Sequence, residues 1–295
     1  MSKRIGLLVA VLLAAVVAAV PYLWGIGLFK SDNSAASAPS SAPPTTVPSS
    51  TVPTPSVTAT VAPPAAPTMS IPLLHPAPVT ISASGFWSYA LMDRNTGQIT
   101  QTSANAATTN VTASMIKAWL AADYLRRNAT VTAYNQHELS IMIRDSDNNA
   151  ASYFWKLDGT FASITRLRAI CGLTDTKGHL DWANTLLSAR DAARMGQCIG
   201  AGIAAGPKWT SWLLNEMRSV RGAGRFGIIT ALPAAVAAQT SIKNGWIAKS
   251  DGDWHVNCMA IGPDWVLGVM TVYPASRGEG QGIGICQSIA SQLMK

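Results

Sequence analysis

The amino-acid sequence predicts an α/β fold in which both ends of the folded region contribute strands to one antiparallel sheet. An all-helical block is inserted between them. Residues 86–94 alternate between apolar and polar positions, as a half-buried strand does. The middle of the chain shows helical spacing of its apolar residues, and the last part returns to a period of two. The late strands are expected over residues 241–248, 254–261 and 265–273.

The N-terminal residues form one long apolar run. Residues 5–29 contain no charged side chain and follow a Lys-Arg pair. This run is long enough to span a bilayer, and it is longer than the apolar part of an ordinary signal peptide. We therefore expect residues 1–30 to be a single-pass signal anchor in the cell membrane, with the N-terminus inside. The alternative is a signal peptide cleaved near Ala18, which would give a secreted protein.

The next segment has the composition of a linker. Residues 31–78 are rich in Ser, Thr, Ala and Pro. They lack the apolar side chains that offset the entropy of ordering a chain, and their prolines favour extended conformations. We expect a disordered linker over residues 31–78 and an extracytoplasmic folded domain over residues 79–295.

The helical block is predicted from apolar residues that recur every three or four positions. Gly172 fits a helix C-cap, and Ser188 with Asp191 resembles an N-terminal capping box. The expected helices cover residues 113–127, 137–144, 149–157, 160–171 and 188–198, and another starts at Pro207. A loop over residues 173–187 interrupts them. A last amphipathic helix over residues 283–293 can pack on the sheet.

Charge and histidine distribution exclude several classes of function. The formal net charge is +7, but the basic residues form no cluster of the kind that nucleic acid requires. The histidines are scattered, which favours neither a zinc site nor a Ser-His-Asp triad. Residues 222–227 match a dinucleotide-binding glycine pattern, but they follow a helix rather than a strand and are predicted to be a loop. We expect no metal, no cofactor and a monomer.

Four cysteines fall in the last part of the chain, and none shows Cys-x-x-Cys spacing. In an exported domain they are candidates for two disulfides. We expect Cys171 to pair with Cys198 and Cys258 with Cys286, because each pair would join neighbouring elements. Spacing alone does not fix the pairing, and buried free thiols are the alternative. No cysteine precedes Cys171, so lipid attachment through an N-terminal cysteine is not expected.

Ser114 and Lys117 lie three positions apart at the start of a predicted helix, so their side chains share one face. A serine hydroxyl is a weak nucleophile, and a partly desolvated, uncharged amine can accept its proton. The first turn of a helix also presents free N–H groups, which favour an oxyanion. The pair therefore predicts a nucleophile with its base. A capping serine beside a solvated lysine is the alternative.

Two later stretches add polar groups. Ser146 and Asn148 lie at a junction between helices, where either could also be a simple cap. Lys243 lies in an otherwise apolar strand and is followed by Asn244 and Gly245. Glycine in a strand often marks the close approach of a ligand or of another backbone segment. A functional site that combines the three stretches is therefore expected.

Taken in order, these stretches resemble the motifs of the penicillin-recognising serine hydrolases. Residues 114–117, 146–148 and 243–245 are similar to Ser-x-x-Lys, Ser-Asp-Asn and Lys-Thr-Gly, and the second is the form found in class A β-lactamases. The resemblance covers residues 85–295. It implies a β-lactamase/transpeptidase-like sandwich with an inserted all-helical subdomain.

The resemblance also implies a catalytic role for four residues. Ser114 would be the acylated nucleophile and Lys117 its general base or proton relay. Ser146 would pass the proton to the leaving amine. Lys243 would supply positive charge for Ser146 and for a substrate carboxylate. These roles require the four side chains to meet in one cleft.

The resemblance implies substrate-binding roles for four more residues. Asn148 would hold the substrate amide, and the N–H groups of Ser114 and Trp246 would form an oxyanion hole beside Gly245. Asn244 replaces the threonine of the third motif, so an amide rather than a hydroxyl would bind the carboxylate.

A second departure concerns the acid that activates the deacylating water in class A β-lactamases. A loop glutamate does so in that family. The only glutamate between the second and third motifs here is Glu216, which lies in a predicted helix. The loop acids are Asp175 and Asp181, and either would have to reach the water with a shorter side chain.

The expected function is therefore that of a serine hydrolase forming an acyl-enzyme at Ser114 with β-lactams or D-alanyl-D-alanine peptides. A catalytically weak or inactive protein of the same fold that binds peptidoglycan is the alternative.

Overall fold

The computed structural model describes residues 74–294. The predicted signal anchor and most of the predicted linker lie outside these residues and stay predictions. In the described part of the chain, no helix is long and apolar enough to cross a bilayer. Leu74 is buried and pairs with Met294, and the N–H of His75 donates to the carbonyl of Leu293 at 2.6 Å. The folded domain therefore includes residues 74–78. The sequence had assigned these residues to the linker, with folding expected to begin at Val79.

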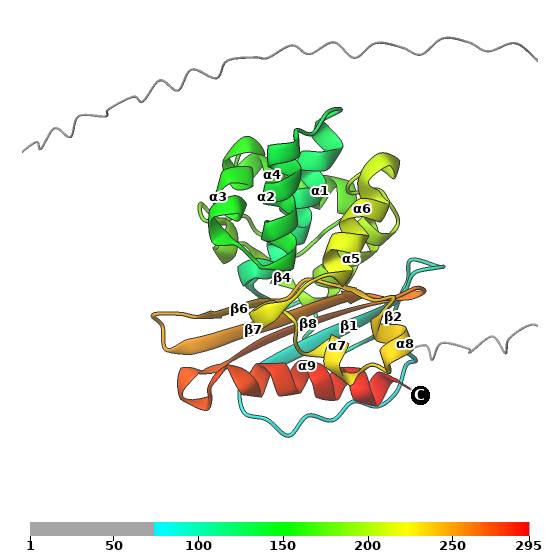
Figure 1. Cartoon of the computed structure of the whole chain (residues 1–295). Helices are drawn as coiled ribbons and strands as arrows, with labels where there is room; N and C mark the ends of the chain where they lie inside the picture. Colours follow the sequence, from blue (N-terminus) through cyan, green and yellow to red (C-terminus); the bar gives the residue numbers. More distant parts are fainter. Residues whose placement is uncertain (1–73, 295) are drawn as a thin grey trace, which may run out of the picture. The chain divides into compact units, whose positions relative to one another are not determined.

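One antiparallel sheet contains strands from both ends of the folded region, which confirms the predicted α/β architecture (Figure 1). The strand order is β2-β1-β8-β7-β5, and β6 also pairs with β7. The strands are β1 (Phe86–Asp93), β2 (Ile99–Thr102), β5 (Ser241–Ile242), β6 (Gly245–Ala248), β7 (Asp253–Ile261) and β8 (Trp265–Pro274). The N-terminal strand β1 therefore lies next to the late strand β8, because the chain returns after the helical insertion.

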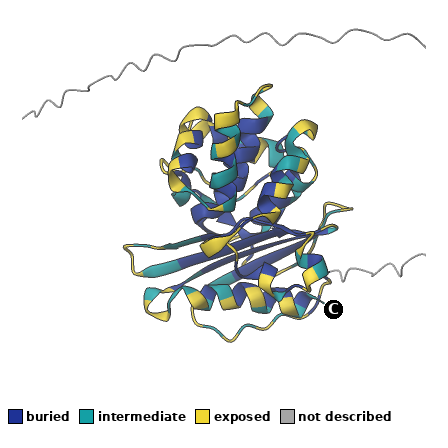
Figure 2. Ribbon diagram, viewed as in Figure 1, coloured by how far each residue is buried: buried dark blue, intermediate teal, exposed yellow. Residues whose placement is uncertain are grey.

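Helices cover both faces of the sheet (Figure 1). The C-terminal helix α9 (Glu279–Leu293) lies on one face with α7 (Ile228–Ala231) and α8 (Ala234–Ala237) near its end, and α5 packs on the other face. The inserted helices are α1 (Lys117–Arg127), α2 (Ala133–Arg144), α3 (Asn148–Leu157), α4 (Phe161–Cys171), α5 (Ala189–Gly200) and α6 (Pro207–Arg218). Buried residues lie on both faces of the sheet and between these helices (Figure 2). The predicted final helix therefore packs on the sheet as expected.

Two predicted elements are interrupted in the structure, and both interruptions occur at site residues. The helix expected from residue 113 starts as a 3-10 turn, η1 (Ala113–Ile116), before α1, and Ala113 has a φ of +46°. The strand expected over 241–248 is divided into β5 and β6, with Lys243 and Asn244 between them. The spacing of apolar residues continues across both interruptions, so a period of 2 or 3.6 residues could not predict them.

A small second sheet joins the segment before the predicted nucleophile to the segment before α5. Strand β3 (Thr109–Val111) pairs with β4 (Leu186–Ser188), and neither strand was predicted. The Ser188 hydroxyl accepts a hydrogen bond from the N–H of Asp191, which confirms half of the predicted capping box. The other half is wrong, because the Asp191 carboxylate accepts N–H groups of the preceding loop, including Thr176 at 2.9 Å. This carboxylate thereby anchors the loop that leads to the cavity described below.

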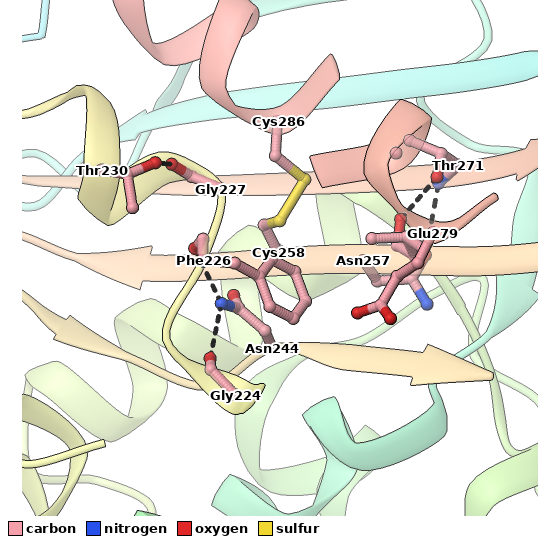
Figure 3. Close-up of a disulfide and its surroundings, with 12 residues drawn as sticks. Gly224, Phe226, Gly227, Thr230, Asn244, Asn257, Cys258, Thr271, Glu279 and Cys286 are labelled. Carbon is pink, nitrogen blue, oxygen red and sulfur yellow. Dashed lines mark hydrogen bonds between the residues drawn. A yellow bond between two sulfur atoms is a disulfide. The ribbon is translucent and has the colours of Figure 1, made fainter. Parts of the chain in front are cut away.

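Both predicted disulfides are present. Cys171 pairs with Cys198 and links α4 to α5. Cys258 pairs with Cys286 and links β7 to α9 (Figure 3). Neighbouring elements are joined in each case, as the sequence argument required.

Candidate active site

Ser114, Ser146 and Asn148, which belong to the first two motifs, line a cavity of about 400 Å³ between the sheet and the helical lobe. Five parts of the chain contribute to it: the 3-10 turn η1, the junction before α3, helix α3 itself, the 3-10 turn η2 (Trp182–Asn184) with the residue before it, and β6. The lining residues are Ala113, Ser114, Asp145, Ser146, Asn148, Ser152, Asp181, Trp182, Ala183, Trp246 and Ile247. The predicted nucleophile therefore shares a cavity with Ser146, and the buried Lys117 and Lys243 contact Ser146 from behind the cavity lining.

Ser114 lies on η1, with only 9% of its surface exposed. The backbone is unusual on both sides of the cavity, because Ala113 and Ser146 have φ angles of +46° and +61°. Such conformations are costly for residues other than glycine, and they tend to occur where function constrains the backbone. Two of the three positive φ angles at residues other than glycine in the described part of the chain lie at this cavity, and the third is at Thr160.

Lys117 is fully buried and directs its ammonium group toward the junction before α3. Its Nζ donates to the Ser146 carbonyl at 2.5 Å and to Asn148 Oδ1 at 2.7 Å, and it lies 3.3 Å from Ser146 Oγ. The Asn148 amide is thus held by the lysine. No hydrogen bond in the described part of the chain joins Lys117 to Ser114 Oγ.

Lys243 also contacts the Ser146 hydroxyl. It is fully buried between β5 and β6, and its Nζ lies 2.9 Å from Ser146 Oγ. Ser146 is therefore contacted by both lysines. In this arrangement, a proton could move between either amine and the Ser146 hydroxyl.

Burial changes the ionisation of both amines. Loss of hydration lowers the pKa of Lys117 to about 7, and the nearby Asp147 carboxylate opposes this shift. Loss of hydration also lowers the pKa of Lys243 well below its usual range, and repulsion from Lys117 adds to the effect. A neutral amine is therefore accessible near physiological pH, which is what a general base requires.

Strand β6 approaches η1 so closely that only glycine fits at its first position. A Cβ on Gly245 would lie 2.1 Å from the Thr112 carbonyl oxygen and 2.9 Å from the Ser114 nitrogen. This contact brings the start of β6 beside the N–H of the nucleophile. Trp246 follows on the strand, lines the cavity and packs edge-on against Phe226, with 5.5 Å between the ring centres.

Asn244 has an environment that differs from its predicted role. Its amide nitrogen donates to the carbonyls of Gly224 at 3.0 Å and Phe226 at 2.9 Å, and the residue is 1% exposed (Figure 3). It does not line the cavity, so the structure offers no contact by which this amide would bind a substrate carboxylate. Instead, Asn244 holds the 222–227 segment, which is a loop containing one 3-10 turn, as predicted.

The acids considered for deacylation are differently placed. Glu216 is buried and bound by Arg144, outside the cavity. Asp175 is bound by Arg190 and Ser188, also outside it. Asp181 does line the cavity.

Replacing Asp175 with asparagine is expected to lower the free energy of unfolding at pH 7 by about 1–3 kcal/mol, because a charge-assisted hydrogen bond is lost. The bond from Arg190 is the main cause that lowers the pKa of Asp175 to about 2. This contribution is therefore present above the ordinary aspartate pKa and disappears as the pH falls through about 2. Denaturation of both proteins between pH 7 and pH 2.5 should show the difference narrowing. A difference that does not change with pH would contradict this assignment.

Three cavity residues were not singled out from the sequence. Trp182 lies with its ring centre 4.8 Å from Lys117 Nζ. Ser152 Oγ accepts a hydrogen bond from the Trp182 indole at 3.3 Å. Asp145 is paired with Arg221, whose hydrogen bond lowers the pKa of this carboxyl. From the sequence, Trp182 was placed only in the loop over residues 173–187.

No known family profile matches the sequence. The chain is similar to solved β-lactamases in its fold. A β-lactamase from Chitinophaga pinensis matches with a TM-score of 0.59 and 16% identity, over 72% of this chain and 93% of that one. A class A β-lactamase from Bacteroides cellulosilyticus matches with a TM-score of 0.60 and 13% identity, over 72% and 91%. The domain therefore has a class A β-lactamase-like fold.

The sequence is also similar to a mycobacterial protein named "Putative lipoprotein LppW", found in Mycobacterium tuberculosis and Mycobacterium bovis. The two are 30% identical over 205 residues, which are 64% of this chain. The chain spans 63% of the length of that relative.

Proposed function

We propose that this protein is an extracytoplasmic serine hydrolase that forms an acyl-enzyme at Ser114 with β-lactams or D-alanyl-D-alanine peptides. The β-lactamase-like fold supports the proposal, and one observation carries it. Two buried amines, Lys117 and Lys243, contact the hydroxyl of Ser146 in the cavity that Ser114 lines. Such a set of groups suits acyl transfer, which needs a nucleophile, a base and a proton donor for the leaving group.

The proposed reaction begins with attack of Ser114 Oγ on the substrate carbonyl carbon. Neutral Lys117 takes up the hydroxyl proton, and the carbonyl oxygen becomes an oxyanion next to the N–H groups of Ser114 and Trp246. The carbon–nitrogen bond then breaks. Ser146 gives its proton to the leaving nitrogen and regains one from Lys117, while Lys243 stabilises the developing charge. An ester between Ser114 and the substrate remains, and the proton count balances.

Brief exposure to a labelled penicillin tests this proposal. We expect an intact-mass increase equal to one penicillin, located on the peptide that contains Ser114, and no increase in a Ser114→Ala variant. Ser103→Ala is a matched control, because Ser103 lies outside the cavity. Absence of label from the wild type, or equal labelling of Ser114→Ala, would contradict the proposal.

The second candidate function is peptidoglycan binding with little or no turnover. It is favoured by the position of Asn244, whose amide is bonded to two backbone carbonyls and faces no part of the cavity. A chromogenic cephalosporin distinguishes the two functions. Turnover above the Ser114→Ala background supports the hydrolase, whereas binding of muropeptides without acylation supports the binding protein.

We also propose that residues 1–30 anchor the protein in the membrane and that the linker holds the folded domain outside it, with the linker ending before Leu74 rather than at residue 78. The name of the mycobacterial relative describes a lipoprotein, which supports a membrane-associated location. Because the first cysteine of this sequence is Cys171, we assign the attachment to the apolar run. The full chain should require detergent for extraction from membranes, and recovery in the soluble fraction would contradict this assignment.

A further inference from the structure

Trp182 covers the buried amine of the candidate site. Its ring centre is 4.8 Å from Lys117 Nζ, and the residue is only 9% exposed although it lines the cavity. A cation above an indole ring is attracted to it. The ring therefore occupies space from which water would otherwise reach the lysine.

The loop that carries Trp182 is fixed to its surroundings at several points. The indole N–H donates to Ser152 on α3, and the indole of Trp155 donates to the Leu180 carbonyl at 3.3 Å. On the other side, Lys249 donates to Asn184 Oδ1 at 3.1 Å. Contacts with both α3 and the end of β6 thus hold η2 in place, and the indole is part of a fixed wall.

No carboxylate of the described residues contacts Lys117 or stands free beside Ser114. Of the acids that line the cavity, Asp145 accepts a bidentate pair from Arg221. Asp181 accepts the N–H of Ala183 at 3.1 Å and the side chain of Asn184 at 2.9 Å within its own turn. Because both acids already accept hydrogen bonds from protein groups, Lys117, the amine that the ring covers, is the base assigned to a water that attacks an ester on Ser114.

We propose that Trp182 is a positioning residue that shields Lys117 and keeps the hydrolytic water away from the acyl-enzyme, which makes the ester on Ser114 long-lived. This inference rests on the proposed function. In the step that it slows, a water oxygen bonds to the ester carbonyl carbon and the bond from that carbon to Ser114 Oγ breaks. The water proton passes through Lys117 to Ser114 Oγ, and the substrate leaves as a carboxylic acid.

Shielding also affects the charge state of Lys117. Because loss of hydration is the main cause of its lowered pKa, admitting water should raise that pKa. Asp147 and Lys243 are the charged groups that act on the amine, and Asp145 and Asp181 line the cavity beside it; all of them remain when Trp182 is replaced. A change in the pH dependence of acylation would therefore report on the ring itself.

The test compares Trp182→Ala and Trp182→Phe with the wild type by following a penicillin adduct by intact mass. Trp182→Ala is expected to shorten the lifetime of the adduct by about tenfold or more at pH 9, because a general base becomes accessible to water. The midpoint of the pH–acylation profile should move to higher pH. Trp182→Phe keeps a ring over the amine and loses the bond to Ser152, so it should behave as the wild type.

Trp209→Ala provides the matched control. It also removes an indole ring from above a lysine, since Lys208 Nζ lies 5.3 Å from that ring centre, but it lies outside the cavity. Its adduct lifetime should equal that of the wild type. Circular dichroism would verify that all variants are folded.

Equal adduct lifetimes in Trp182→Ala and the wild type would overturn the inference and leave the proposed function intact. Shortening in both Trp182→Ala and Trp182→Phe would also overturn it, because the bond to Ser152 rather than the ring would then be responsible. If the wild type forms no adduct at all, the proposed function and this inference both fail.

Discussion

Replacing Lys117 with methionine is expected to slow acylation of Ser114 by about 10²- to 10⁴-fold, the range that loss of a general base produces. The pKa of Lys117 is about 7 because the amine is buried, so a large fraction is neutral near physiological pH. In the wild type, acylation should rise as the pH increases through about 7, because only the neutral amine can accept the hydroxyl proton. Stopped-flow measurement with a chromogenic cephalosporin from pH 5.5 to 9 would record this profile.

Two further variants test whether the effect is due to loss of the base rather than to loss of a positive charge. Lys117→Arg keeps a cation but cannot lose its proton in this range, so its acylation should be slow and should not increase through pH 7. Lys156→Met removes an exposed lysine from α3 and should leave both rate and profile unchanged. Acylation by Lys117→Met at the wild-type rate would show that the proton goes elsewhere.

Local sequence patterns were sufficient to predict most elements of the fold. Apolar spacing identified the inserted helices and the late strands, because a helix repeats at 3.6 residues and a strand at two. Gly172 indeed ends α4 with a φ of +65°. The disulfides agree with the expected pairing, although the spacing of the cysteines left it open, because each links elements that are close along the chain and packed together in the fold.

The parts that could not be predicted depend on contacts between distant segments. The direction of the Asn244 side chain is set by two carbonyls about twenty residues earlier, at Gly224 and Phe226. The alternation of side chains along a strand gives no guidance at this point, because β5 ends at Ile242 and β6 begins at Gly245. Backbone carbonyls that are buried away from water need hydrogen-bond donors, and the Asn244 amide donates to both of these carbonyls.

Convergence of the motif residues in one cavity followed from the resemblance, but their detailed contacts did not. The sequence placed Lys117 next to Ser114, whereas in the structure the lysine bonds to Ser146 and Asn148. The position of Trp182 above Lys117 depends on a loop anchored from two sides. No local signal marks such a position, although the absence of a loop glutamate indicated that this region departs from the family pattern.

Replacing Gly245 with alanine is expected to have a large effect on both stability and acylation. The new Cβ would lie 2.1 Å from the Thr112 oxygen and 2.7 Å from the Met115 nitrogen, and both are backbone atoms that cannot rotate away. Either β6 or η1 must therefore move. Overpacking of this kind costs about 1–3 kcal/mol or more, and denaturant unfolding would measure the loss.

The acylation rate of Gly245→Ala should fall by a larger factor than its stability, because the added Cβ would also lie 2.9 Å from the backbone nitrogen of Ser114. A displacement of about 1 Å at a reacting group can reduce a rate about 10²-fold. The contrasting control is Gly284→Ala in α9, where an added Cβ meets nothing within 4 Å. Alanine is the better helix former by about 0.5–1 kcal/mol, so this variant should be slightly more stable and acylate normally. If Gly245→Ala retained wild-type stability and acylation, β6 would not press against the nucleophile as tightly as the structure indicates, and the oxyanion site assigned there would lose its basis.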